Sequence, residues 1–564
     1  METIAIDCET VSLQDQTLVA ITISDEKSDK IIPVRMNTTK NWDKQKVIDY
    51  MSDLIKNNKI IFHNSSFDIP VLVKYGIPFS HFQDVEDTLV LANLFDENVR
   101  HGLKSLAKRY LHRHPKTYKE VAGRGKKQKD FCDIPWEQAQ EYAMADSRNT
   151  YDLYMYLISR LDPQVAQLYY NIEKPLLIVV SDMHLKGVTV DVMKVQQLEH
   201  EFKQKMEQAK KELTKRIPNI NINSSKQLRE YFIDKLGMPV LKRSVKTDKP
   251  SVDSEVLEQY AETNNIAKHI LDYRKWMKLH STFIPALTPK KYNLSTMKGK
   301  IHPNFNQAAT TSGRFSSSEP NFQNIPREDE LGLRSVIVAD EGNVLIGFDY
   351  SQIELRLLAE ITQDENLVSA YKNDEDIHQK TSLACGVSRY DAKTINFAIV
   401  YGIGVRSLAK KLGCSFIDAD FYVTRYHKTY PGIKQMWTKA KYDITTKGYV
   451  QTLFGRRRHR SKDFFAKSNF EQGAEIRSLN NSIIQGSGSD LLKKAMVSMY
   501  PQLLKYGASI VACIHDEVLV ECPADKAKQV YAVVHRSMVD AGKDLSVIIK
   551  VEGGIGNDWS QVHG

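Results

Sequence analysis

The amino-terminal part of the chain alternates short apolar runs with segments of helical periodicity. Runs of strand length lie at residues 3–7, 18–23, 30–34 and 60–63, and segments of helical length lie at 42–56 and 67–75. Strands that alternate with helices in this way are typical of an α/β unit. The pattern therefore predicts an α/β domain at the start of the chain.

The pattern then changes twice along the chain. Between residues 172 and 286 it becomes helical and strongly charged, with helices expected at 196–216 and 252–278 and turn-forming residues between them. This part predicts an antiparallel helical projection. From residue 301 onward strand and helix patterns mix, which predicts a large second α/β or α+β body.

Composition narrows the class of protein. The 564 residues are too many for one hydrophobic core, and 42% hydrophobic with 26% charged residues is an ordinary globular balance. The net charge of +9 permits a polyanionic partner without requiring one. Six scattered cysteines indicate reduced thiols, not a zinc site or a disulfide framework. With no evident signal peptide and no apolar run long enough to span a bilayer, we expect a cytoplasmic protein without membrane contact.

Two aspartates close apolar, strand-like runs in the second body. Asp349 follows the run 344–348, and Asp516 follows the run 509–514 and His515. Acidic side chains at the ends of buried strands are costly unless they are paired or metal-bound. Brought together, they would make an oxygen site for Mg²⁺, the ion that accompanies substrate phosphates. The pair therefore points to phosphoryl transfer.

One predicted helix, over residues 388–404, carries basic and aromatic side chains along one face. Arg389, Lys393, Phe397 and Tyr401 recur every four residues and so lie on one helical face. Two cations followed by two aromatic rings suit a triphosphate at one end and a base or sugar at the other. A packing stripe with incidental charge is the alternative. The basic run 455–460 likewise fits a phosphate contact or a solvated turn, with the phosphate contact favoured.

Four acids are expected to gather in the amino-terminal domain. Asp7 and Glu9 point to one face of a strand, Asp68 follows in the pattern Asn-x-x-Phe-Asp, and Asp146 follows Tyr142 by one helical turn. Such a cluster would repel itself without cations. The ordered set resembles the DEDD-type 3′→5′ exonucleases, in the branch with Tyr in its last motif. The resemblance implies that these four acids hold two divalent ions and that Tyr142 orients the attacking water.

The second body resembles the family A DNA polymerases. Asp349-Tyr-Ser-Gln-Ile-Glu354 matches motif A, the stripe from Arg389 to Tyr401 with Gly402 matches motif B, and His515-Asp516-Glu517 matches motif C. The implied fold is an RNase H-like α/β exonuclease domain followed by a right-hand polymerase body with an α+β palm, a helical thumb and helical fingers. The implied divisions are exonuclease 1–165, start of palm and thumb 166–300, palm 301–355, fingers 356–475 and palm 476–564.

The resemblance also implies roles for single residues. Asp349, Asp516 and the Tyr350 backbone would hold two Mg²⁺, with Mn²⁺ as a substitute. The implied dNTP contacts are His378, Arg389, Lys393, Phe397, Tyr401, Gln352 and Glu354. Of these, Glu354 would act as a steric gate against ribonucleotides. The implied primer-template contacts are Arg314, Arg477, Asn481, Gln485 and His515.

The implied function is a template-directed DNA polymerase with a proofreading exonuclease, acting on primer-template DNA and dNTPs. A DNA-binding 3′ exonuclease with a relict polymerase body and a single-subunit RNA polymerase relative are the alternatives. The thumb shows no thioredoxin-binding insertion, and a helicase, a primase and a single-strand binding protein are expected as unidentified partners. The start of the chain leaves no room for a 5′ nuclease, which favours a bacteriophage-type enzyme, with the host cytoplasm as its location.

Overall fold

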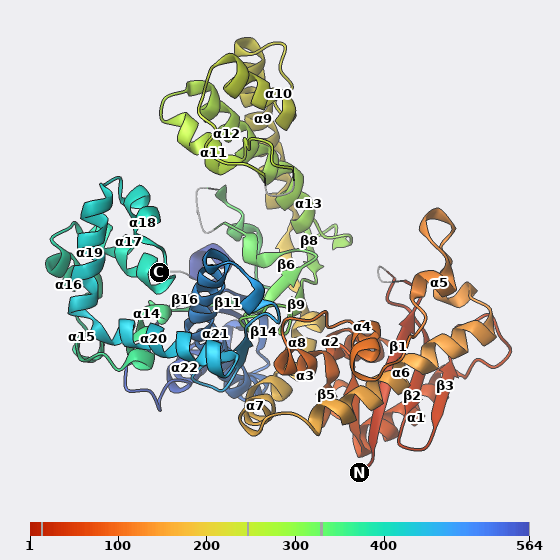
Figure 1. Cartoon of the computed structure of the whole chain (residues 1–564). Coiled ribbons are helices and arrows are strands. Elements are labelled where there is room, and N and C mark those ends of the chain that lie inside the picture. The colour runs from red at the N-terminus through yellow and green to blue at the C-terminus, as the bar shows by residue number, and fades with distance from the viewer. Residues whose placement is uncertain (13–14, 245–246, 327–330, 563–564) are drawn as a thin grey trace.

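A computed structural model describes the chain apart from residues 13–14, 245–246, 327–330 and 563–564. Figure 1 shows an amino-terminal α/β domain on one side, a helical arm that projects from the molecule, and a central sheet with a further group of helices on its far side. The expected order of an α/β domain, a helical projection and a mixed second body is confirmed.

The amino-terminal domain is built on a five-stranded sheet in the order β3-β2-β1-β4-β5. Its strands are β1 (Thr3–Thr10), β2 (Leu18–Ser24), β3 (Asp29–Pro33), β4 (Lys59–Phe62) and β5 (Val85–Asp87). Strands β1 to β3 pair antiparallel, whereas β4 is parallel to both β1 and β5. Every residue of β2 is buried, because layers cover both faces of the sheet there. The helices are α1 (Lys44–Asn57), α2 (Ser65–Tyr75), α3 (Thr88–Phe95), α4 (Leu103–Tyr110), α5 (Tyr118–Ala122) and α6 (Trp136–Ile158).

A short connecting region joins this domain to the rest. It comprises α7 (Pro163–Leu168), a π-helical turn (Tyr169–Glu173), α8 (Lys174–Lys186) and β6 (Val188–Asp191). Strand β6 pairs with β8 (Lys298–Ile301), which also pairs with β7 (Tyr292–Asn293). Strands β9 (Asn304–Asn306) and β10 (Ser316–Ser318) form a separate ribbon.

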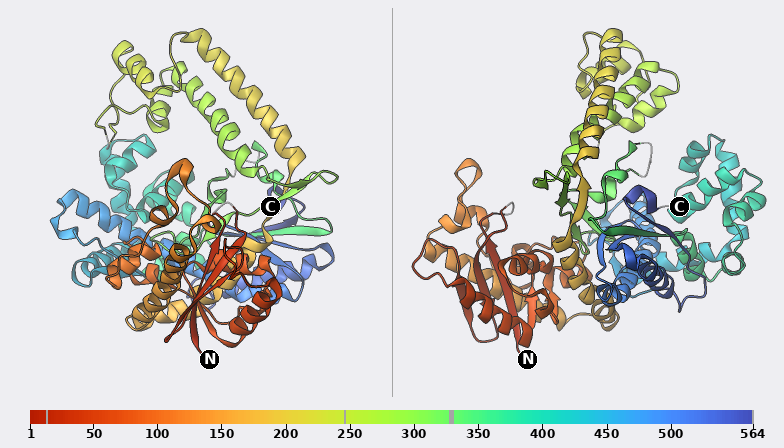
Figure 2. Two further views of the ribbon diagram at one scale, coloured as in Figure 1. Left: turned by 90° about the vertical axis from the view of Figure 1, so that its right-hand side faces the viewer. Right: turned by 180° about the vertical axis from the view of Figure 1, so that it is seen from behind.

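The helical arm consists of α9 (Val192–Arg216), α10 (Ser225–Arg229), α11 (Ser254–Ala261), α12 (Asn265–Lys278) and α13 (Ile284–Leu287). Figure 2 shows its two long helices, α9 and α12, side by side. The arm has its own hydrophobic core, which includes Leu213, Phe232 and Tyr260. The expected helical stretch 252–278 is divided into α11 and α12, because the Asn264 side chain accepts hydrogen bonds from backbone N–H groups in the first turn of α12.

The central sheet has the order β14-β15-β11-β16 and is antiparallel throughout. Its strands are β11 (Asn343–Tyr350), β14 (Ser509–Ile514), β15 (Glu517–Pro523) and β16 (Val551–Gly556), and it packs against α21 (Asn469–Leu504) and α22 (Ala527–Asp540). In the register of β11 and β15, Asp349 lies opposite Glu517. Both expected aspartates therefore lie at one end of adjacent strands.

The group of helices beyond the sheet comprises α14 (Ile353–Thr362), α15 (Glu365–Lys372), α16 (Ile377–Cys385), α17 (Arg389–Val400), α18 (Val405–Leu412), α19 (Phe416–Thr429) and α20 (Pro431–Thr446). A hairpin of β12 (Tyr449–Gln451) and β13 (Arg457–His459) follows. Helix α17 ends at Val400, with Tyr401 as its C-cap and Gly402 next in a left-handed conformation with φ of 64°, a stop that fits the position of this glycine.

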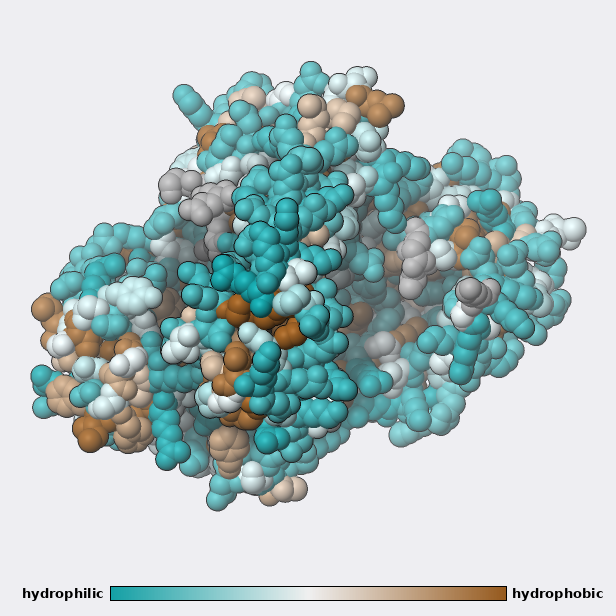
Figure 3. All heavy atoms as spheres, turned by 90° about the horizontal axis from the view of Figure 1, so that it is seen from above, coloured by the Kyte–Doolittle hydropathy of each residue, from teal (hydrophilic) through white to brown (hydrophobic). Residues whose placement is uncertain are grey.

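The surface is mostly hydrophilic in the view of Figure 3, with apolar residues gathered on the side of helices α16 to α19. Exposed side chains there include Tyr390, Phe416, Ile417 and Phe421. Among the helices that the structure describes, none is long and apolar enough to cross a membrane.

Candidate active sites

Three of the four acids predicted in the amino-terminal domain form a cluster. Asp7 and Glu9 project from one face of β1, and Asp146 projects from α6, so that one carboxylate oxygen of each lies within 4.8 Å of the others. Burial and then the neighbouring Asp146 raise the pKa of Asp7 to about 7. Burial and Asp7 likewise raise the pKa of Glu9. The cluster holds more negative charge than its surroundings balance.

Lys104 on α4 is a cation of this cluster that sequence reasoning missed. Its Nζ donates to both carboxylate oxygens of Asp146, at 2.6 and 2.7 Å, and lies 3.9 Å from the centre of the Tyr142 ring. Tyr142 is buried one helical turn before Asp146. Lys104 therefore faces three carboxylates, and nothing in its local sequence distinguishes it from Lys108, the other lysine of α4.

Asp68 lies outside the three-acid cluster. It is buried in the first turn of α2, and its Oδ1 accepts a hydrogen bond from the backbone N of Cys8 at 3.0 Å. Burial, followed by the negative charge of Asp7, raises its pKa. Asp68 thus borders the cluster through β1, while its carboxylate bonds the backbone between Asp7 and Glu9.

The second candidate site lies at the end of the central sheet. Asp349 is half-buried near the end of β11, and Asp516 lies in the tight turn between β14 and β15. The backbone N of Tyr350 donates to the Asp516 carbonyl at 3.4 Å, so the two motif segments are directly joined. Glu517 instead points into the interior, where its Oε1 accepts from Trp559 Nε1 at 2.6 Å. Asp349 and Asp516 thus lie at the sheet end, whereas Glu517 is used in packing.

A chain of contacts joins this sheet end to the adjacent helices. Arg314 Nη2 donates to Glu354 Oε1 at 2.9 Å and lies 3.7 Å from Asp516 Oδ1. The Tyr401 hydroxyl donates to the other oxygen of Glu354 at 2.6 Å. Glu354 is only 8% exposed, so both contacts occur largely out of solvent. Four residues predicted from separate motifs therefore meet in one place.

Most of the other predicted dNTP contacts lie along α16 and α17. Arg389 Nε pairs with Asp376 Oδ2 at 2.7 Å, and Lys393 is exposed. His378 is buried, with its Nδ1 2.9 Å from Asn396 Nδ2 and its ring 6.0 Å from that of Phe397. Gln352 precedes α14 in a left-handed conformation and accepts from the Tyr371 hydroxyl at 3.4 Å.

The predicted DNA contacts lie on α21 and in the β14–β15 turn. Arg477, Asn481 and Gln485 follow one another every four residues, so they share one stripe of α21. Arg477 lies against Gly402, where an added Cβ would be 3.2 Å from its Cγ. His515 adopts a left-handed conformation with φ of 55° and is exposed.

Comparison with known proteins matches both parts of the chain. Residues 1–162 match the 3′-5′ exonuclease family, and residues 192–561, more than half of the chain, match DNA polymerase family A. The chain belongs to DNA polymerase family A. The predicted resemblance is thereby confirmed.

Individual relatives agree with the family assignment. The chain is 32% identical to DNA polymerase I of Pseudomonas aeruginosa over its whole length and 36% identical to thermostable DNA polymerase I of Thermus aquaticus over 75% of it. It spans 64% and 51% of those two proteins. The polymerase domain of Pol1 from M. smegmatis, solved with DNA primer-template and dNTP, matches with a TM-score of 0.85 and 25% identity over 99% of this chain and 96% of that one. The predicted fold, an exonuclease domain followed by a right-hand polymerase body, is confirmed. These bacterial relatives lend no support to the expected bacteriophage origin.

Gln323 is a residue beside the central sheet to which sequence reasoning gave no role. Its Oε1 accepts from the backbone N of His515 at 2.7 Å, and its Nε2 donates to the Cys513 carbonyl at 2.9 Å. It thereby holds the end of β14 and His515, the residue that leads into Asp516. Both partners lie about 190 positions later in the chain, so the sequence around Gln323 gives no signal of these contacts.

The favoured interpretation of the basic run 455–460 as a phosphate contact is wrong for Arg456. Its side chain is 4% exposed and forms ion pairs with Glu173 and Asp490. Its neighbours bind the exonuclease domain: Arg457 pairs with Asp162 at 2.6 Å and Arg458 with Glu97 at 2.7 Å. The carboxylates that meet these cations lie far away in sequence, so the local pattern could not reveal them.

The acids that gather at the two sites fit divalent cations. Carboxylate oxygens are the ligands that Mg²⁺ prefers, and the exonuclease cluster offers three of them within 4.8 Å. A divalent ion there would offset the burial and the mutual repulsion that raise the pKa of Asp7 and Glu9. Asp349 and Asp516 offer the same kind of donor at the end of the central sheet.

Proposed function

We propose that this chain is a template-directed DNA polymerase with a 3′→5′ proofreading exonuclease. The observation that carries the proposal is the meeting of Arg314, Glu354, Tyr401 and Asp516, from four separate motifs, in one chain of contacts. The family membership supports it. The domain divisions proposed from the sequence, at residues 165, 300, 355 and 475, belong to the same proposal.

In the synthesis site, Asp349, Asp516 and the Tyr350 backbone would hold two Mg²⁺, or Mn²⁺ in its place. Such ions lower the barrier for attack of the primer 3′-hydroxyl on the nucleotide α-phosphate. Arg389, Lys393 and His378 would bind the triphosphate, since they lie on adjoining faces of α16 and α17. Phe397 and Tyr401 would stack near the sugar and the templating base, and Gln352 would contact the incoming nucleotide.

Glu354 supports a preference for deoxynucleotides. Arg314 and Tyr401 hold its two oxygens, so the carboxylate is kept in one place beside the sheet end. A fixed side chain there would occupy the volume of a ribose 2′-hydroxyl. This weighs against the RNA polymerase alternative. Arg314, Arg477, Asn481, Gln485 and His515 would contact the primer-template, where minor-groove acceptors are largely common to all base pairs.

In the exonuclease site, Asp7, Glu9, Asp68 and Asp146 would hold two further divalent ions that activate the water and stabilise the leaving 3′ oxygen. Tyr142 would orient the attacking water. Asp68 would take part through Oδ2, since its Oδ1 accepts from the Cys8 backbone. The cytoplasmic location and the helicase, primase and single-strand binding partners stay predictions from the sequence.

Extension of a labelled primer-template tests the proposal. With Mg²⁺ and dNTPs we expect a lengthened primer, and with Mg²⁺ alone a shortened 3′ end; EDTA should stop both. Shortening without any extension would favour an exonuclease with a relict polymerase body. Faster extension with rNTPs than with dNTPs would favour the RNA polymerase alternative.

A further inference from the structure

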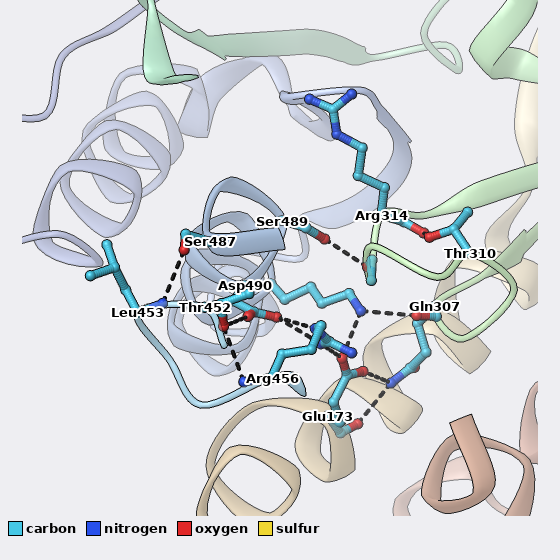
Figure 4. Close-up of polar contacts among 12 residues, drawn as sticks. Glu173, Gln307, Thr310, Arg314, Thr452, Leu453, Arg456, Ser487, Ser489 and Asp490 are labelled. Atoms are coloured by element: carbon cyan, nitrogen blue, oxygen red, sulfur yellow. Dashed lines mark hydrogen bonds and ion pairs between the residues drawn. The ribbon is translucent and has the colours of Figure 1, made fainter. Parts of the chain in front are cut away.

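A fully buried cluster of four charged side chains lies where the connecting region, the β12–β13 hairpin and helix α21 meet. Its acids are Glu173 and Asp490, and its cations are Arg456 and Lys493. Each is at most 4% exposed. Figure 4 shows the side chains of Glu173, Arg456 and Asp490 pointing toward one another from three different elements.

Arg456 is the centre of this cluster. Its Nε and Nη2 donate to Asp490 Oδ1 at 2.9 and 2.6 Å, and the same Nη2 donates to Glu173. Lys493 Nζ donates to Glu173 Oε1 at 2.7 Å. Two positive and two negative charges therefore balance. Because the planar guanidinium reaches two carboxylates at once, a lysine at position 456 could keep the charge but not both contacts.

The cluster also binds both ends of the loop from Gln307 to Arg314. At one end, Gln307 Nε2 donates to Glu173 Oε2 at 2.6 Å, and the Gln307 carbonyl accepts from Lys493 Nζ at 2.9 Å. At the other end, the Arg456 guanidinium lies directly against Gly313, where an added Cβ would be 2.6 Å from Arg456 Cζ.

Two hydroxyl groups complete the attachment. Ser489, next to Asp490 on α21, donates from its Oγ to the Gly313 carbonyl at 2.7 Å, and Thr310 Oγ1 donates to the Arg314 carbonyl at 2.7 Å. Figure 4 shows the Arg314 side chain extending away from the cluster. On that side it meets Glu354 and Asp516. The backbone at Gly313 and Arg314 is thus held by the two hydroxyl groups and by packing against Arg456, while the Arg314 side chain enters the synthesis site.

We propose that Arg456, with Glu173, Asp490 and Lys493, is a positioning residue that holds the Gln307–Arg314 loop so that Arg314 reaches Glu354 and Asp516. Arg456 touches no reacting group and acts through Arg314. Because Glu354 is the proposed gate against ribonucleotides, the cluster controls nucleotide selection as well as insertion rate. The inference rests on the proposed polymerase function.

A double-mutant cycle tests the inference with the full chain. The variants are Arg456→Lys, Arg314→Ala and both together, assayed for single-nucleotide insertion with dNTP and rNTP. In the otherwise unchanged chain we expect Arg456→Lys to lower the insertion rate about tenfold and to reduce dNTP over rNTP discrimination. With Arg314→Ala already present, the same change should lower the rate by about twofold or less, because residues that act through one another are not additive.

Two controls separate positioning from general damage. Arg457→Lys alters the neighbouring residue of the same hairpin, which pairs with Asp162 instead, and should leave insertion within about twofold of the unchanged chain. Excision of a single-stranded 3′ end by Arg456→Lys should also be unchanged. If Arg456→Lys does not fold, Ser489→Ala is the second variant, because it removes only the hydroxyl that holds Gly313. In the same cycle, Ser489→Ala should lower the insertion rate about threefold in the otherwise unchanged chain. With Arg314→Ala already present, it should cause no further loss.

The outcomes are distinct. Equal losses from Arg456→Lys with and without Arg314, or no loss at all, would overturn the positioning role. A chain that adds no nucleotide even without substitutions would refute the proposed function itself, and the inference with it.

Discussion

The exonuclease cluster and the cluster around Arg456 both bury charged groups, but they differ in how far nearby cations offset the effect of burial on the carboxyl pKa values. In the first, Asp7, Glu9 and Asp146 share one cation, Lys104, and the pKa of Asp7 is raised to about 7. In the second, burial is deeper and raises the pKa of Asp490, yet Lys493 and Arg456 outweigh burial at Glu173 and lower its pKa to about 2.

The difference is one of charge balance. Burial alone disfavours an ionised carboxylate, and only nearby cations reverse that effect. A cluster whose own side chains neutralise it is complete and can serve to position other groups. A cluster with excess negative charge requires a cation from outside, which is the condition for a metal site.

The largest effect should come from removing the acids of the unbalanced cluster. We expect Asp7→Asn with Glu9→Gln to reduce 3′ excision by about a thousandfold or more, since the ligands of the catalytic ions are lost, while synthesis is kept. Asp349→Asn should do the reverse. Excision of a labelled single strand and extension of a primer-template measure the two activities. Loss of both activities in either variant would contradict two separate sites.

An intermediate effect is expected from Glu173→Gln in the balanced cluster. Because the folded pKa of Glu173, about 2, lies below its ordinary 4.5, the ionised group stabilises the fold above pH 4.5, and this stabilisation is lost as the pH falls through about 2. The shift corresponds to about 3 kcal/mol. At pH 7 the unfolding temperature of Glu173→Gln should lie well below that of the unchanged chain. The gap between the two temperatures should narrow as the pH falls from 4.5 toward 2. A gap that stays constant with pH would contradict the assigned ion pairs.

The smallest effect concerns Lys104. Replacing it by methionine removes a positive charge beside the exonuclease acids, so a divalent cation should bind about fivefold more tightly. Calorimetric titration with Mn²⁺, in a chain that also carries Asp349→Asn and Asp516→Asn, isolates this site. Lys493→Met is the matched control: it should lower the unfolding temperature without changing Mn²⁺ affinity. Equal affinities with and without Lys104 would show that its charge does not oppose metal binding.

Several features could be predicted from sequence because they depend on neighbours within a few residues. The alternation of β1 puts Asp7 and Glu9 on one face, and the spacing of four puts Arg389, Lys393 and Phe397 on one stripe of α17. Helix and strand positions in the exonuclease domain follow the same local periodicity. The motifs that carry the family resemblance are also continuous or nearly so, and the order of domains follows from them.

Tertiary structure decided which groups meet across the chain. Glu173 and Arg456 are 283 positions apart, so nothing near Arg456 predicts a buried ion pair rather than a phosphate contact. Lys104 reaches Asp146 only because α4 and α6 pack together, and the backbone of Cys8 binds the Asp68 carboxylate only because α2 lies beside β1. The sequence by itself thus determined the local elements and the chemistry carried by each motif. The packing of distant segments decided whether each charge is neutralised within the protein or left to bind a ligand, because electrostatic interactions depend on distance in space.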